Sequence, residues 1–94
     1  MNDTYRTLLV SVTGRVQGVS FRVWTLREAQ RLGLRGWVRN ERDGSVRALI
    51  SGPNKAVEAM LEALWVGPRG AAVTNVVAEA AEQQDVPPGF DITG

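Results

Sequence analysis

The sequence predicts an α+β fold in one domain spanning residues 1–94, with two helices on one face of a four-stranded antiparallel sheet. Three observations predict it. Four segments alternate as strands do, two carry apolar residues at helical spacing, and glycine or proline separates most of them. The order is strand, helix, strand, strand, helix, strand. This is the split β-α-β, ferredoxin-like arrangement, which hosts many unrelated functions and therefore decides none.

The first three elements follow from a change in apolar spacing. Residues 7–13 alternate as a strand does, with an apolar side chain at every second position. Gly14 and Gly18 interrupt that pattern, and residues 20–32 then show helical spacing that ends at Gly33. The predicted buried stripe of this helix consists of Phe21, Thr25, Ala29 and Leu32. Residues 34–40 alternate again and predict the second strand.

A hairpin and a second helix are predicted next. Residues 41–44 contain Asp-Gly, which supplies the positive φ that a tight turn requires, and residues 46–51 return as a strand. A helix then opens after Gly52-Pro53-Asn54 and ends at Gly67-Pro68. Its predicted apolar stripe consists of Val57, Met60, Leu61 and Leu64.

The last part of the chain contains a fourth strand and a loop. Residues 72–80 are rich in valine and predict the strand, whereas residues 82–89 are polar, contain two prolines and predict the loop. Residues 90–92 alternate around Asp91. They predict either a short final strand or an extended tail.

Composition narrows the chemistry. The formal net charge is +1, which argues against non-specific nucleic-acid binding. Cysteine and histidine are absent, which excludes disulfides, thiolate nucleophiles, imidazole bases and the usual zinc ligands. Residues 1–6 carry no apolar stretch behind a basic start, and no run approaches the ~20 apolar residues of a membrane span. We therefore expect a cytoplasmic protein without a membrane partner.

The turn between the first strand and the first helix has features of an anion site. Gly14 and Gly18 allow backbone angles that could aim several amides into one concavity, next to the positive end of a helix dipole. Arg22 lies in the first helical turn, where acidic residues are favoured, and no acid follows until Glu28. Two interpretations remain open: a bound anion compensates Arg22, or Arg22 is solvated or paired with a distant carboxylate.

Two motifs carry a resemblance to a known family. The segment Gly14-Arg15-Val16-Gln17-Gly18-Val19-Ser20-Phe21-Arg22 resembles the first signature of the acylphosphatase family. The segment Gly36-Trp37-Val38-Arg39-Asn40, followed by Asp43-Gly44-Ser45-Val46, resembles its second. The resemblance implies that Arg22 binds the substrate phosphate and that Asn40 positions the attacking water. It also implies a phosphate cradle formed by the backbone amides of Arg15, Val16, Gln17, Gly18 and Val19.

The resemblance leaves some roles open. By position alone Asn40 would be a turn residue before the hairpin. Thr25 either supports Asn40 or Arg22 or is a helix residue turned toward the sheet. Ser20 receives no catalytic role. Glu41 and Asp43 are predicted to be turn residues, so no side-chain general base is evident. The tryptophans at 24, 37 and 65 are predicted to be packing residues.

The implied reaction suits these residue types. An acyl phosphate releases a carboxylate whose conjugate acid has a pKa of about 4, so no general acid is needed. Phosphoryl transfer depends mainly on positioning and charge stabilisation, which an arginine fork and backbone amides can supply. No carboxylate cluster marks a magnesium site, so neither a metal nor another cofactor is expected. The expected partner is a small acyl phosphate, and the expected state is a monomer.

Three alternatives stay in view. The chain could be a non-catalytic ferredoxin-like module that holds an anion or a phosphorylated ligand. An RNA-binding module would need exposed aromatic residues on the central strands, and residues 7–13 and 46–51 contain none. A domain of a larger carbamoyl-transferring maturation protein is disfavoured by the initiating Met1 and the predicted closing strand.

Overall fold

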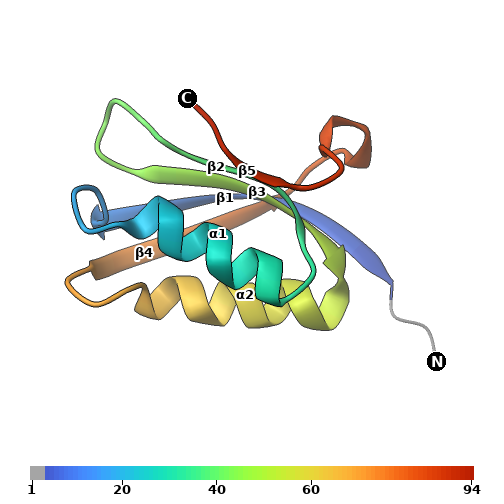
Figure 1. The fold of residues 1–94 in the computed structure, drawn as a ribbon, viewed down its shortest axis with the longest axis horizontal. Helices are drawn as coiled ribbons and strands as arrows, with labels where there is room; N and C mark the ends of the chain where they lie inside the picture. The colour runs from blue at the N-terminus through green and yellow to red at the C-terminus, as the bar shows by residue number, and fades with distance from the viewer. Residues whose placement is uncertain (1–3) are drawn as a thin grey trace.

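The computed structural model describes residues 4–94. The expectation about the start of the chain falls partly on Met1, Asn2 and Asp3, which lie outside the described residues. Two helices cover one face of a single sheet, as predicted (Figure 1). The elements in chain order are β1 (Tyr5–Arg15), α1 (Phe21–Arg31), β2 (Arg35–Asn40), β3 (Val46–Pro53), α2 (Asn54–Val66), β4 (Ala72–Ala80), the 3-10 turn η1 (Gln83–Asp85) and β5 (Phe90–Ile92).

The sheet has the strand order β4-β1-β3-β2-β5, five strands where four were expected. The additional strand is β5, at residues for which a strand or a tail was predicted, and it runs parallel to β2 while all other pairs are antiparallel. The amide of Gly36 donates to the Gly89 carbonyl at 2.9 Å, and the amide of Thr93 donates to the Val38 carbonyl at 2.9 Å. These bonds pair the outer edge of β2, which a four-stranded sheet would leave open.

The core lies between the sheet and the two helices. The predicted alternation is confirmed in the middle of both strands, where every second residue is buried: Leu8, Val10 and Val12 in β1, and Gly36 and Val38 in β2. Most of the predicted helical stripes are buried: Phe21, Thr25 and Ala29 on α1, and Val57, Met60 and Leu64 on α2. The two other predicted members, Leu32 and Leu61, are only partly buried against this core. Burial of these stripes fixes the orientation of α1, and therefore the direction in which its first turn faces.

Two of the three tryptophans pack as expected. Trp24 contacts Phe21 edge to face at 5.3 Å between ring centroids, and Trp37 lies 4.5 Å from the guanidinium carbon of Arg39. Trp65 differs, because it is half exposed on the outer side of α2. Among residues 4–94, no helix has the length and apolar character needed to cross a membrane.

Candidate active site

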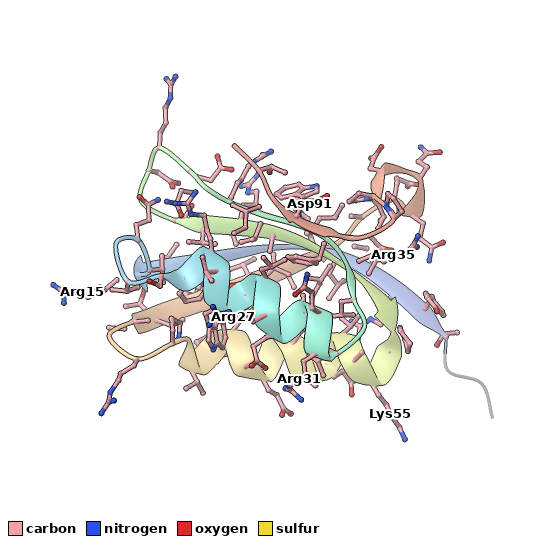
Figure 2. All side chains as sticks on the ribbon, viewed as in Figure 1. Arg15, Arg27, Arg31, Arg35, Lys55 and Asp91 are labelled. Atoms are coloured by element: carbon pink, nitrogen blue, oxygen red, sulfur yellow. The ribbon has the colours of Figure 1, made fainter. Side chains whose placement is uncertain are left out.

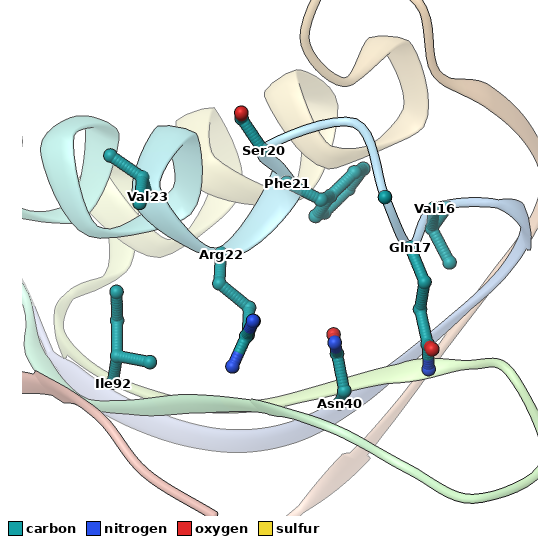
Figure 3. Close-up of a pocket in the computed structure, with 9 residues that line it drawn as sticks. Val16, Gln17, Ser20, Phe21, Arg22, Val23, Asn40 and Ile92 are labelled. Atoms are coloured by element: carbon teal, nitrogen blue, oxygen red, sulfur yellow. The ribbon is translucent and has the colours of Figure 1, made fainter.

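A cavity of about 400 Å³ opens where the β1–α1 loop, the end of β2 and the strand β5 meet (Figure 3). It is lined by Val16, Gln17, Gly18, Ser20, Phe21, Arg22, Val23, Asn40 and Ile92. The structure thus brings Arg22 and Asn40 to one cavity although 18 positions separate them in the sequence. Among residues 4–94, no aspartate or glutamate lines it.

The predicted cradle residues are only partly at this cavity. Val16, Gln17 and Gly18 line it, whereas Arg15 and Val19 do not. Arg15 is the last residue of β1, where a bulge at residues 13–14 carries the strand on to pair with Ala72. Its side chain is exposed and points away from the molecule (Figure 2). The half-buried side chain of Val19 packs against the core instead. A role for the amides of these two residues stays a prediction.

The loop offers free backbone donors, and three of the residues that carry them line the cavity: Gln17, Gly18 and Ser20. Within residues 4–94, the amides of residues 17–20 donate to no protein acceptor. Gly18 has φ +77° and Ser20 has φ +62°, both in the left-handed region that favours glycine. Ser20 precedes α1 without capping it through its side chain, and the first turn of the helix contains no acid. Free amides and a helix N-terminus therefore lie together, as in known anion sites.

Arg22 is half-buried and extends into the cavity beside Asn40 (Figure 3). In the described part of the chain its guanidinium has no ion pair and no hydrogen bond. A pairing of Arg22 with a carboxylate distant in sequence is therefore not found among these residues. A cation at the positive end of a helix dipole is unfavourable by itself, so an anion in the cavity would stabilise this arrangement.

Asn40 is the last residue of β2 and presents its amide to the same cavity. Its Oδ1 is buried and has no hydrogen-bond partner among residues 4–94. A simple turn residue would use its side chain to bond the nearby backbone. Since most buried polar atoms are satisfied, an oxygen without a partner on a residue that lines the cavity favours a bound water molecule or ligand there.

The side chain of Gln17 joins the two halves of the site. Its Nε2 donates to the carbonyl of Glu41 at 2.9 Å and to the carbonyl of Ser45 at 3.0 Å. Both acceptors belong to the β2–β3 hairpin that follows Asn40. This contact was not predicted from the sequence, where Gln17 has only a backbone role. No local pattern could reveal it, because the acceptors lie 24 and 28 positions away.

The acids of the hairpin are engaged in local contacts, as predicted for turn residues. Glu41 pairs with Arg39 at 2.6 Å. Asp43 accepts from the Ser45 hydroxyl at 2.6 Å and from the Ser45 amide at 2.9 Å. The hydrogen bond from the hydroxyl, followed by that from the amide, lowers the pKa of Asp43 from its ordinary value of 3.8. A lowered pKa makes this exposed carboxylate a weaker base, so it does not suit proton abstraction near neutral pH.

Thr25 is buried, and its hydroxyl donates to the carbonyl of Phe21 at 2.9 Å within the same helix. The hydroxyl is therefore not directed at Asn40 or Arg22. Of the two roles considered for Thr25, a helix residue turned toward the sheet fits the structure.

Three apolar residues at the cavity were not identified as site residues from the sequence: Phe21, Val23 and Ile92. Val23 directly follows Arg22, so its position beside the site was open to inference. Ile92 reaches the cavity only because β5 pairs with β2, and the sequence left that pairing open.

Comparison with known proteins agrees with the fold and the motifs. The sequence model of the acylphosphatase family matches residues 8–92. An acylphosphatase of Rhizobium meliloti (strain 1021) is 58% identical over 93 residues, which cover 99% of this chain and 98% of that protein. The crystal structure of acylphosphatase from Bacillus subtilis has a TM-score of 0.90 at 33% identity, covering 97% of this chain and 100% of that chain. An acylphosphatase from Coxiella burnetii has a TM-score of 0.87 at 35% identity, covering 95% and 93%. The chain belongs to the acylphosphatase family.

Proposed function

We propose that this protein hydrolyses acyl phosphates to carboxylate and inorganic phosphate, with Arg22 and loop amides binding the phosphate and Asn40 positioning the water. The observation that carries the proposal is the shared cavity of an unpaired cation and an unpaired buried amide oxygen. Membership of the acylphosphatase family supports the reaction, and the geometry supports the division of roles.

The phosphate end of the substrate would lie between Arg22 and the free amides of residues 17–20. A guanidinium can donate to two phosphate oxygens at once, and each amide adds a further donor. These donors are fixed before the reaction begins, and they face the charge that develops on the transferring phosphoryl group. Removal of one such preorganised donor typically lowers the rate by about 100- to 1000-fold.

The water would be held by Asn40 on the side of the phosphorus opposite the departing oxygen. The oxygen of this water attacks phosphorus. The bond between phosphorus and the acyl oxygen breaks, and its electron pair leaves with the carboxylate. The proton of the water passes to an oxygen of the substrate phosphate. No protein base is needed, which fits a cavity lined by no acid and a chain without histidine.

The same reasoning limits the substrate range and the need for metal. Alkyl phosphate esters release a basic alkoxide that requires protonation, so they should react poorly. We propose that magnesium is dispensable, because Arg22 and the amides would supply the positive charge that a metal otherwise provides. Hydrolysis of benzoyl phosphate should therefore persist in excess EDTA.

Paired substitutions test the assigned roles. Arg22→Ala should abolish both binding of inorganic phosphate and turnover of benzoyl phosphate. Asn40→Ala should retain phosphate binding and lose turnover by about 100-fold or more. Arg27→Ala and Asn75→Ala, which alter exposed residues outside the cavity, serve as matched controls. Full activity of Asn40→Ala would disprove its role.

The main alternative is a non-catalytic module that uses the loop only to bind an anion. Inorganic phosphate would then bind at Arg22 without any turnover of benzoyl phosphate by the unaltered protein. We further propose that residues 1–94 form one domain that acts as a cytoplasmic monomer and binds no nucleic acid. One continuous core that joins both helices to the sheet supports the single domain. Sedimentation at micromolar concentration tests the monomer.

A further inference from the structure

Two apolar side chains stand exposed beside Arg22. Val23 is 43% exposed and Ile92 is 38% exposed, and both line the cavity. Figure 3 shows them on the side of Arg22 away from Asn40 and Gln17. The other large apolar side chains that are exposed among residues 4–94 lie outside this cavity: Tyr5, Trp65, Val66 and Val77.

Strand pairing explains why Ile92 lies at the cavity. Ile92 pairs with Val38 in the parallel β2–β5 ladder, and the adjoining bond from the Thr93 amide to the Val38 carbonyl holds it there. Phe90, two positions earlier and hence on the same face, is buried. Ile92 therefore extends the apolar face of the sheet beyond the core, toward Val23 in the first turn of α1.

The cavity consequently has two chemically different ends. One end is polar, with Arg22, Asn40 and the free loop amides, and it matches a phosphate and a water. The other end is formed by Val23 and Ile92 and offers no charge and no hydrogen bond. Inorganic phosphate has no apolar atoms and would leave that end exposed. An apolar group attached to the phosphate would cover it and remove that surface from water.

We propose, on the basis of the function proposed above, that Val23 and Ile92 form a subsite for the acyl group that selects apolar acyl phosphates. Val23 and Ile92 line the same cavity as Arg22, so the acyl group of a substrate whose phosphate is bound there can extend along the cavity to cover the pair. The substrates favoured by this arrangement carry an aromatic or branched aliphatic acyl group. Acetyl phosphate is too small to cover the pair.

The test compares benzoyl phosphate with acetyl phosphate. Both release carboxylates of similar basicity, so the ratio of their kcat/KM values reports contacts to the acyl group. Val23→Thr and Ile92→Thr keep a β-branched shape while replacing apolar with polar surface. Each should lower the ratio of benzoyl to acetyl phosphate by about fivefold. Val66→Thr, at an exposed position on α2 outside the cavity, is the matched control and should leave the ratio unchanged.

The outcomes separate the subsite from the reaction. An unchanged ratio in both Val23→Thr and Ile92→Thr, with the enzyme active, would overturn the subsite and leave the proposed function standing. Absence of turnover for both substrates in the unaltered protein would overturn the proposed function itself. If the ratio falls only in Ile92→Thr and the melting temperature of that variant is also lower, the fall reflects loss of β5. That result would also count against the subsite. A fall in Val23→Thr at an unchanged melting temperature supports it.

Discussion

The two hydrogen bonds from Gln17 to the β2–β3 hairpin allow a quantitative test of how the site is held together. Gln17 donates from one nitrogen to the carbonyls of Glu41 and Ser45, at 2.9 and 3.0 Å. Gln17→Met keeps the length and approximate shape of the side chain but removes both donors. The two carbonyls then lose one partner each, and the loop loses its polar connection to the strand end that carries Asn40.

The expected loss of stability follows from the remaining bonds. The Glu41 carbonyl still accepts from the Gly44 amide at 3.2 Å, and the Ser45 carbonyl still accepts from the Glu41 amide at 2.8 Å. Neither carbonyl is orphaned, so the cost is that of two ordinary hydrogen bonds, about 2 kcal/mol in the free energy of unfolding. For a chain of this length, that corresponds to a fall in melting temperature of about 8–16 °C.

Activity should fall as well, because the proposed phosphate ligands and the proposed water ligand lie on the two segments that Gln17 joins. A displacement of about 1 Å between them can cost about 100-fold in rate, so we expect kcat to drop by about 10- to 100-fold. Circular dichroism melts and steady-state hydrolysis of benzoyl phosphate measure the two effects. Gln30→Met, on the exposed side of α1, is the control. A melting temperature and kcat equal to those of the unaltered protein would refute the reasoning. A lower melting temperature with unchanged kcat would limit Gln17 to a structural role.

Four further substitutions test other parts of the structure. Gly36→Ala would place a Cβ 1.7 Å from the carbonyl oxygen of Leu49, so urea denaturation should show a loss of about 3 kcal/mol or more. Gly44 also has a positive φ, but nothing lies within 4 Å of a Cβ added there. Gly44→Ala should therefore lose only about 1–2 kcal/mol of unfolding free energy. Thr25→Val removes a hydroxyl bonded within its own helix, so it should lower the melting temperature while kcat stays close to normal. The folded pKa of Asp43 lies below its ordinary 3.8, so the stabilisation from its carboxylate is present above that pH and is lost as pH falls through the folded pKa. Asp43→Asn should accordingly be less stable than the parent at pH 7 and approach it in acid melts.

The fold was largely predictable from the sequence because its signals are local. Alternation in residues 7–13 and 34–40, helical spacing in residues 20–32 and the Asp-Gly turn each depend on neighbouring residues alone. The strand β5 is only three residues long, too short for a periodic pattern, and it exists because the open edge of β2 accepts it. Pairing of this kind depends on residues more than fifty positions apart, so the sequence left residues 90–92 undecided.

In the candidate site, too, local sequence signals could be predicted and tertiary contacts could not. Arg22 was suggested by its own position, since an arginine in a first helical turn without nearby acid is unusual. Asn40 came from the resemblance alone, because its local pattern is that of a turn. The side-chain bonds of Gln17 and the cavity position of Ile92 follow from tertiary contacts. The bulge that removes Arg15 from the cavity likewise depends on pairing between β1 and β4.

The two central residues of the site are each unfavourable in the free protein. Arg22 places a charge at the positive end of α1, at a cost of about 0.3–1 kcal/mol, and an unpaired buried oxygen such as Asn40 Oδ1 costs about 1–3 kcal/mol. Packing alone does not explain either arrangement, because Arg22 is only half-buried and the Asn40 amide faces a cavity. One ligand set relieves both, since an anion at Arg22 and a water at Asn40 would lie side by side. The residues that weaken the free fold are thus those that we propose bind the two reactants, and their common cost supports the proposal that the cavity is a site of reaction.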